Sequence, residues 1–310
     1  MVAWLLQGKD MATEWIAVDW GTSNLRVWVF GVEGITQLIS DRGLGGLAPE
    51  EFEAALLDLI DPYLPDAGKT PIIACGMVGA KQGWHEAPYA ATPCAVPGIL
   101  EAVHVPVDDP RLDLRILPGV MQAKPADVMR GEETQIGGFL ATHSGFDGIV
   151  CLPGTHTKWV HISAGEIVSF RTVMTGELFT VLTKHSVLRH TVGADGWDQP
   201  AFLEAVSDAM TSPQRVTAKL FGLRAGALLD GVGPDVMRSR LSGFLTGLEL
   251  SGTRDYWLGQ DIALIGAPAL TTNYEAALAA QGLKARVFDG APLVLAGLKA
   301  AHDGIKGTNG

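Results

Sequence analysis

A glycine turn between two short apolar strands occurs twice in this chain of 310 residues, and it narrows the folds open to the chain. The first copy covers residues 15–30 and turns at residues 21–24, while the second covers residues 149–162 and turns at residues 154–157. Apolar and other side chains alternate after the first turn, which is the period of a β-strand. We therefore expect two β-hairpins, each opening its own sheet.

Backbone N–H groups converge in a small, hydroxyl-rich glycine turn, and such a nest binds phosphate oxygens. Walker loops and dinucleotide-binding loops are excluded, because their glycines lead directly into a helix. One such hairpin fits an ordinary polar turn equally well, but two copies favour a polyphosphate held from both sides. The candidate phosphate ligands are Gly21, Thr22, Ser23, Asn24, Arg26, Gly154, Thr155, His156, Thr157 and Lys158. Arg26 also fits a surface arginine, and His156 a structural hydrogen-bonding residue.

Three carboxylates stand beside these turns. Asp19 ends the strand before Gly21, where it could hold Mg²⁺ next to phosphate oxygens or cap the turn. Glu132 and Glu133 start a predicted helix, where one of them could act as the general base for a hydroxyl nucleophile. The same two acids also fit a helix start that complements the helix dipole. The sequence does not decide between Glu132 and Glu133.

The rest of the chain alternates between predicted strands and helices. The first half predicts strands at residues 35–40, 71–75 and 114–117, helices at residues 49–60 and 127–142, and a loop at residues 81–97. The second half predicts strands at residues 167–173, 262–265 and 286–288, a mainly helical stretch at residues 175–257, and helices at residues 273–281 and 292–301. Gly266, Ala267 and Pro268 follow a buried strand and suit a flat ring such as adenine, although this signal is weak.

This pattern predicts an α/β duplication. We expect an N-terminal lobe over residues 12–140, a C-terminal lobe over residues 141–290, and a closing helix over residues 291–303 that packs back on the first lobe. The first ten residues have no basic start and no extended apolar segment, so they are not a convincing signal peptide. They are set aside as an extension before a possible start at Met11.

The composition narrows the function classes. Apolar residues make up 47% and charged residues 18%, as in ordinary globular proteins. A net charge of −11 argues against binding to nucleic acid or to an anionic membrane. Three cysteines without metal spacing predict a reduced, cytoplasmic protein. The sequence leaves a homodimer open.

Together, these motifs resemble the superfamily of sugar kinases, Hsp70 and actin, in which two phosphate hairpins, a connecting helix and an adenosine motif occur in this order. More narrowly, several strings are similar to the 2-keto-3-deoxygalactonate kinase family. They lie at residues 18–24, 76–79, 83–89, 129–135, 153–159 and 174–179. The resemblance implies duplicated ribonuclease H-like (actin-like ATPase) domains, with mixed sheets flanked by helices and a central cleft. One departure is Leu152-Pro153 in the second hairpin, where many superfamily members carry an acid.

The resemblance also implies ATP- and Mg²⁺-dependent phosphorylation of the 6-hydroxyl of 2-keto-3-deoxy-D-galactonate in galactonate catabolism. Asp19 would then be the main metal ligand, and Glu132 or Glu133 the base. The candidate residues for the sugar acid are Gly76, Met77, Val78, Gly79, Trp84, Glu86, Tyr89, Thr175, Gly176 and His185. A kinase of another aldonate or hexose and an exopolyphosphatase-like hydrolase are the enzymatic alternatives. A nucleotide switch like actin or a chaperone is disfavoured, because no appended domain follows the closing helix.

Overall fold

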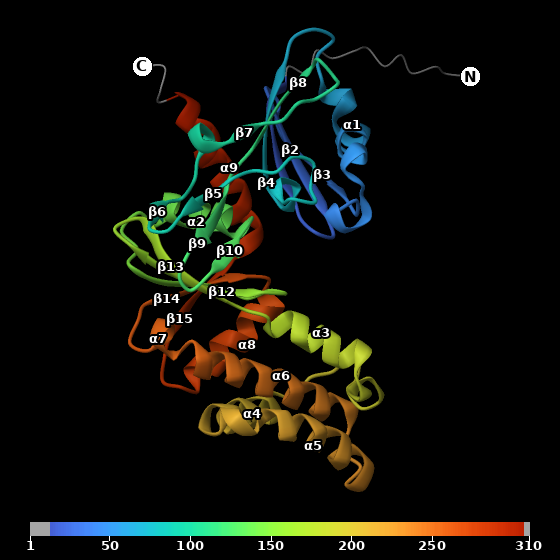
Figure 1. Ribbon diagram of the computed structural model, residues 1–310, viewed down its shortest axis with the longest axis vertical. Helices are drawn as coiled ribbons and strands as arrows, with labels where there is room; N and C mark the ends of the chain where they lie inside the picture. Colours follow the sequence, from blue (N-terminus) through green and yellow to red (C-terminus); the bar gives the residue numbers. More distant parts are fainter. Residues whose placement is uncertain (1–12, 307–310) are drawn as a thin grey trace, which may run out of the picture. The chain divides into compact units, whose positions relative to one another are not determined.

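The computed structural model describes residues 13–306, which form two compact units (Figure 1). Unit 1 contains the described residues up to His143 together with those from Pro292 onward. Unit 2 runs from Ser144 to Ala291. The first ten residues, set aside above, lie outside the described range.

Unit 1 is built on a mixed sheet with the order β3-β2-β1-β4-β8-β7. Strand β1 pairs antiparallel with β2, and β2 pairs antiparallel with β3. On the other side, β1 pairs parallel with β4, and β4 pairs parallel with β8. The bounds are β1 Thr13–Trp20, β2 Leu25–Gly31, β3 Gly34–Ser40, β4 Thr70–Gly76, β7 Val103–His104 and β8 Leu112–Ile116.

Unit 2 repeats this arrangement, with the order β15-β14-β11-β12-β13. Strands β11, β12 and β13 pair antiparallel in sequence, whereas β11, β14 and β15 pair parallel. The bounds are β11 Gly148–Leu152, β12 Thr157–Ser163, β13 Glu166–Val173, β14 Ile262–Gly266 and β15 Ala285–Asp289. Three antiparallel strands extended by two parallel ones, present twice, are a duplicated ribonuclease H-like fold of the actin-like ATPase type.

Helices cover both faces of the first sheet. Helix α1 (Phe52–Ile60) buries Phe52, Leu56 and Ile60 against the sheet. Helix α9 (Gly290–Lys306) packs on the other face through Val294 and Leu298. Helix α2 (Glu132–Thr142) crosses α9 closely at Gly138. A Cβ at this position would lie 2.0 Å from the Leu293 carbonyl oxygen, so only the absence of a side chain permits the crossing.

Unit 2 carries most of its helices between β13 and β14. Helices α4, α5 and α6 lie side by side in Figure 1. Glycines bring α4 and α6 together, since a Cβ on Gly243 would lie 2.3 Å from the Phe202 carbonyl oxygen. The bounds are α3 Thr175–His185, α4 Gln199–Thr211, α5 Val216–Leu229, α6 Pro234–Gly252, α7 Arg254–Trp257 and α8 Pro268–Ala279. Short 3₁₀ helices lie at Leu44–Gly46, Pro49–Glu51, Asp61–Tyr63, Met77–Gly79, Ile99–Glu101, Val187–His190 and Pro213–Arg215.

The structure corrects three predicted elements. The helix predicted at residues 127–142 begins only at Glu132, because residues 127–129 form strand β10 (Asp127–Met129) beside β9 (Gly119–Gln122). The predicted loop at residues 81–97 contains β5 (Tyr89–Ala91) and β6 (Cys94–Ala95). Helix α8 begins five residues before the predicted Asn273, because Pro268 suits the first turn of a helix.

Candidate functional site

The first glycine turn has an exposed tip on a fixed base. The Gly21 N–H donates to the Asn24 carbonyl oxygen at 2.9 Å, which closes the turn. The loop after β3 packs beneath it, since the Gly45 N–H donates to the Thr22 carbonyl oxygen at 2.9 Å. The side chains of Thr22, Ser23 and Asn24 are exposed. The expected phosphate ligands therefore lie at an open hairpin tip.

Asp19 lies at the base of this turn and pairs with Arg26. The two are cross-strand partners in β1 and β2, and the Arg26 Nε donates to Asp19 Oδ2 at 2.9 Å. The other carboxylate oxygen, Oδ1, lies 3.9 Å from the buried Cys75 Sγ. A Cβ on Gly76 would lie 3.4 Å from the same oxygen, so Gly76 keeps the space beside Asp19 open.

Glu133 is the buried member of the acidic pair at the start of α2. Its two carboxylate oxygens accept the Gly131 N–H at 2.8 and 2.7 Å. Burial, followed by the charge of Glu132, raises the pKa of Glu133 to about 7. Glu132 is half-buried and accepts the Arg130 backbone N–H at 3.1 Å. The two neighbouring carboxylates therefore have different surroundings.

This acidic pair and Asp19 belong to one electrostatic cluster. Burial raises the pKa of the Cys75 thiol, and the charges of Asp19 and Glu133 raise it further. A Cβ on Gly131 would lie 3.3 Å from the Gly76 Cα, which places the start of α2 against the end of β4. Unit 1 thus brings together the predicted metal ligand, the predicted bases and the Gly76 loop.

The expected sugar-acid residues of unit 1 divide into groups. Gly79 packs under Arg130, whose guanidinium also lies 4.2 Å from the centre of the Tyr89 ring. Trp84 instead packs against Phe52 in the core. Val78 is buried in that core, Met77 is half-buried, and Glu86 is exposed.

Arg130 is the residue of this region that sequence reasoning left out of the site. Its Nη2 donates to the Ala87 carbonyl oxygen at 2.8 Å, but its Nε and Nη1 are buried without a hydrogen-bond partner. Buried polar groups normally have partners, so two unpaired donors mark a place where an acceptor is missing. The signal in the sequence was an arginine directly before the Gly131-Glu132-Glu133 string.

The second glycine turn is braced by α3. A Cβ on Gly176 would lie 2.3 Å from the Gly154 carbonyl oxygen, so only glycine allows this contact. The Glu177 N–H donates to the Thr155 carbonyl oxygen at 2.9 Å. His156 and Glu177 meet at 2.5 Å between Nε2 and Oε2. Thr175 and Gly176, predicted for the sugar acid, thus lie beside the second phosphate turn.

Lys158 lies on the far side of β12 from its neighbours Thr157 and Trp159, because successive strand residues alternate in direction. Its Nζ donates to Thr172 Oγ1 at 2.8 Å. His185 is exposed at the other end of α3 from Thr175.

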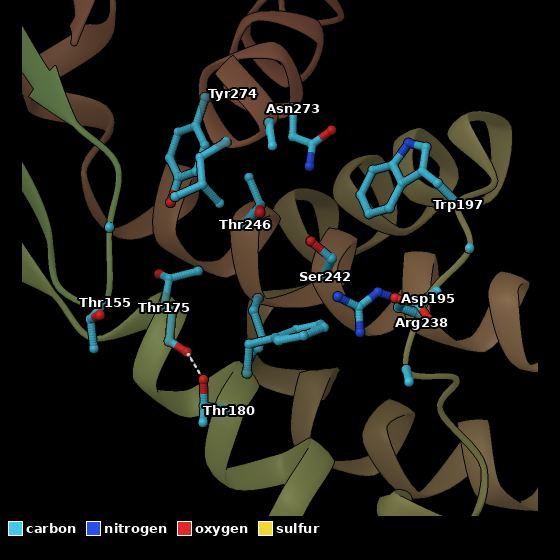
Figure 2. A pocket seen from close by; sticks show the side chains of 18 residues that line it. Thr155, Thr175, Thr180, Asp195, Trp197, Arg238, Ser242, Thr246, Asn273 and Tyr274 are labelled. Carbon is cyan, nitrogen blue, oxygen red and sulfur yellow. Dashed lines mark hydrogen bonds between the residues drawn. The ribbon is translucent and has the colours of Figure 1, made fainter. Parts of the chain in front are cut away.

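A pocket of about 690 Å³ opens in unit 2 next to this turn. Figure 2 shows Thr155 and Thr175 at one end, and Asp195, Trp197 and Arg238 at the other. Its volume is within the range of small-molecule sites. The lining residues are Gly154, Thr155, Thr175, Gly176, Phe179, Thr180, Ala194, Asp195, Gly196, Trp197, Arg238, Ser242, Leu245, Thr246, Ala269, Leu270, Asn273 and Tyr274.

The predicted adenosine motif, Gly266, Ala267 and Pro268, does not itself line this pocket, whose lining on α8 includes the next residue, Ala269. A Cβ on Gly266 would lie 3.4 Å from the Pro153 carbonyl oxygen, so the motif lies beside the second glycine turn. Sequence reasoning missed the residues from α6 and from the loop before α4. Arg238 is one of them: its guanidinium lies 5.0 Å from the centre of the Phe179 ring. Arg238 lies in a long helix without a recognisable motif around it, so the local sequence does not identify it as a pocket residue.

Within residues 13–306, no group of three His, Cys, Asp or Glu side chains is arranged to bind a metal ion. Asp19 could therefore supply one carboxylate ligand, and phosphate oxygens and water would supply the rest. In the same range, none of the helices has both the length and the apolar character needed to cross a membrane.

A duplicated fold of this type, with a glycine turn at the first hairpin of each sheet and a pocket beside the second turn, is that of the actin-like ATPase class. The family model of 2-keto-3-deoxy-galactonokinase matches residues 19–301. A probable 2-dehydro-3-deoxygalactonokinase of Rhizobium meliloti is 41% identical, covering 93% of this chain and 96% of its own. The 2-dehydro-3-deoxygalactonokinase of Escherichia coli is 33% identical, over 94% and 99%.

A solved structure agrees with the sequence relatives. The crystal structure of a protein from Sinorhizobium meliloti, described as a 2-dehydro-3-deoxygalactonokinase, superposes with a TM-score of 0.86. It is 41% identical and covers 94% of this chain and 99% of its own. The chain belongs to the 2-keto-3-deoxy-galactonokinase family. It is a sugar-acid kinase that uses ATP, which confirms the resemblance seen in its motifs.

Proposed function

We propose that the protein transfers the γ-phosphoryl group of ATP to the 6-hydroxyl of 2-keto-3-deoxy-D-galactonate. The product is the 6-phosphate, formed in the cytoplasm during galactonate catabolism. The observation that carries the proposal is the family match over residues 19–301. The open glycine turns and the pocket beside the second turn support it, because phosphoryl transfer depends mainly on positioning and on charge stabilisation.

ATP would contact the pocket of unit 2 and the turn beside it. The nucleoside would occupy the 690 Å³ pocket, whose near end is formed by Gly154 and Thr155. The N–H groups of residues 154–157 would bind its phosphates, and those of residues 21–24 in unit 1 are proposed phosphate donors of the same kind. Mg²⁺ would lie at Asp19 and lower the negative charge of the phosphates. Arg26 fixes the Asp19 carboxylate from the neighbouring strand.

Glu133 is proposed as the base and Glu132 as the neighbour that tunes it. A base works best when its pKa lies near the working pH, and that of Glu133 is raised to about 7. The charge of Glu132 contributes to this rise. Catalytic hydrogen bonds often form only once substrate is bound, so burial in the free protein is compatible with this role. The hydroxyl proton would move to the Glu133 carboxylate as the oxygen attacks phosphorus.

The sugar acid would bind at the Gly76–Gly79 loop and Tyr89. Arg130 packs against both Gly79 and Tyr89 and has two unpaired donors. Its positive charge would attract the substrate carboxylate in a protein whose net charge is −11. Thr175 and Gly176 are instead proposed to serve the nucleotide, since they line the pocket of unit 2.

The test is a coupled assay of ADP release over a panel of 2-keto-3-deoxy aldonates, hexoses and polyphosphate. Fastest turnover with 2-keto-3-deoxy-D-galactonate is expected. Polyphosphate breakdown without any sugar would instead indicate a hydrolase. Faster turnover of another aldonate would identify that aldonate as the substrate.

Glu133→Gln and Glu132→Gln form a matched pair for the base assignment. Glu133→Gln is expected to lower kcat by ~10²–10⁴-fold with little change in the KM for ATP. Glu132→Gln should retain most of kcat and shift the acid limb of the pH profile to lower pH, because the neighbouring charge is lost. Full kcat in Glu133→Gln would exclude this residue as the base.

A further inference from the structure

Glu249 is a buried carboxylate that accepts hydrogen bonds from three other elements of unit 2. It lies on α6 with 2% of its surface exposed. Its Oε1 accepts the indole N–H of Trp159 on β12 at 2.8 Å. Its Oε2 accepts the Tyr274 hydroxyl of α8 at 2.8 Å and the Thr175 hydroxyl at the start of α3.

Two of the residues that donate hydrogen bonds to Glu249 line the pocket where ATP is proposed to bind. Thr175 and Tyr274 both line the 690 Å³ pocket. Tyr274 also exchanges a hydrogen bond of 2.9 Å with the Thr157 hydroxyl, which ends the second glycine turn. Gly176, next to Thr175, lies against Gly154 of that turn. One carboxylate therefore links the turn, the start of α3 and the pocket wall on α8.

A need for core stability does not explain this choice of residue. Burial of a carboxylate is unfavourable, and replacing a buried charged cluster as a whole by apolar residues of similar volume often leaves a core as stable or more stable. Burial raises the pKa of Glu249, although the hydrogen bonds that its carboxylate accepts lower it. The carboxylate fixes the orientation of the groups that donate to it. The indole N–H of Trp159 can only donate a hydrogen bond. The hydroxyls of Thr175 and Tyr274 donate to Glu249, so their rotation is fixed and their lone pairs point away from the carboxylate.

We propose that Glu249 is a positioning residue for ATP, holding the second glycine turn, the start of α3 and the pocket wall of α8 at the spacing that the nucleotide needs. The inference rests on the proposed function in one respect, that ATP occupies this pocket. Glu249 itself does not contact the reacting atoms.

The experiment measures ATP binding directly by calorimetry, and KM and kcat by the coupled assay, in the full-length protein. Glu249→Gln keeps the volume of the side chain but replaces one accepting oxygen by an amide NH₂ group. This group can only donate, and its neighbours are donors as well. The substitution is expected to weaken ATP binding about tenfold, the effect of losing hydrogen bonds to a charged group. The KM for the sugar acid should stay unchanged, and kcat should fall less than ATP binding does.

Three further variants test positioning apart from folding. Glu249→Leu leaves the Trp159 N–H and the hydroxyls of Thr175 and Tyr274 without their acceptor, so its melting temperature should fall and its ATP binding should weaken at least as much as that of Glu249→Gln. Tyr274→Phe removes one donor and should weaken ATP binding by a smaller factor. Thr253→Val is the matched control, because Thr253 is fully buried and does not line the pocket, and its hydroxyl donates at 2.9 Å to the backbone carbonyl of Glu249, not to the carboxylate. It should bind ATP like the wild type.

The outcomes distinguish this inference from the proposed function. If the wild type binds ATP but phosphorylates no sugar acid, the proposed function fails, while weaker binding in Glu249→Gln still supports the inference. If Glu249→Gln and Glu249→Leu bind ATP as tightly as the wild type, the inference alone is overturned. Should Glu249→Gln fail to fold, Tyr274→Phe is compared with Thr253→Val. Weaker ATP binding in Tyr274→Phe supports the inference, and equal binding in the two variants overturns it.

Discussion

Glu133 and Glu249 are both buried carboxylates, but their surroundings differ. Glu249 receives three side-chain donors. Glu133 receives the Gly131 N–H and a single side-chain hydroxyl, that of Thr134 at 3.3 Å, and it faces the charge of Glu132. A carboxylate that few groups stabilise becomes a better proton acceptor near neutral pH. The contrast suits a base at one site and a fixed structural acceptor at the other.

The raised pKa of Glu133 predicts a pH-dependent stability. The folded state binds this proton more tightly than the unfolded state, where the pKa is about 4.3. The stabilising effect is therefore complete below about pH 4.3 and is lost as the pH rises through about 7. The loss amounts to roughly 4 kcal/mol, at about 1.4 kcal/mol for each unit of difference between the two pKa values. Glu133→Gln should lack this loss, so its free energy of unfolding should gain on that of the wild type between pH 5 and pH 8.

Urea unfolding at both pH values measures this difference. Glu166→Gln, which changes an exposed carboxylate, is the control and should follow the wild type. Equal pH dependence in the wild type and Glu133→Gln would contradict the raised pKa.

Local sequence revealed some of these residues and not others. Asp19, Glu132 and Glu133 stand beside recognisable turns or strings, so they could be predicted as members of a site. Glu249 could not, because its partners Trp159 and Thr175 are 90 and 74 residues away. The pairing of Asp19 with Arg26 depends on hairpin register, which a two-strand pattern alone leaves undefined.

Among the elements, α2 and α9 show how glycine sets a helix crossing. Gly138 of α2 faces Leu293 of α9, and a Cβ on Gly297 would lie 1.9 Å from the Thr134 carbonyl oxygen. The start of α2 carries the acidic pair, so the crossing fixes the helix that positions the proposed base. The partner helix lies far away in the sequence, so the residues of α2 alone do not identify which helix it crosses.

Gly138→Ala is expected to destabilise the protein by about 1–3 kcal/mol, because backbone atoms of α9 cannot yield to a new Cβ. The higher helix propensity of alanine acts in the opposite direction by roughly 1 kcal/mol. Gly222→Ala in α5 is the matched control, since open space surrounds Gly222. Chemical denaturation should show a loss for the first variant and a small gain for the second. Equal stability of the two would show that the crossing is looser than described.

The errors in element prediction have a common cause. Residues 127–129 carry a helix-like pattern, yet they pair with β9 in the small sheet β10-β9-β5. Short strands of two or three residues gain their stability from partners elsewhere in the chain, so local propensity does not reveal them. The hairpins and long helices, which carry their own periodicity, were predictable.

For the whole molecule, every lining residue of the 690 Å³ pocket, where ATP is proposed to bind, comes from unit 2. ATP should therefore bind without the sugar acid and raise the melting temperature. At a concentration of about 100 times Kd, the expected stabilisation is about 2.7 kcal/mol. Thermal unfolding with a non-hydrolysable ATP analogue, with and without the sugar acid, measures this. No shift until sugar is added would indicate that unit 2 alone does not form the nucleotide site.

The duplication of the strand order was predictable, because the strand–turn–strand motif recurs in the sequence. The pocket was only partly predictable, since its far end comes from α6 and from the loop at residues 194–197. Between the equivalent strands, unit 2 carries α3 to α7 where unit 1 carries α1, so comparison of the two halves does not reveal the role of the additional helices.

The two glycine turns occupy the same place in two equivalent sheets, yet Asp19 precedes one and Leu152 precedes the other. Two identical turns would present the same side chains to a ligand. With an acid retained in a single copy, the second turn has a leucine at the position where the first has the proposed metal ligand. The two copies have therefore diverged in charge, and a role that depends on a carboxylate at this position can belong only to the turn of unit 1.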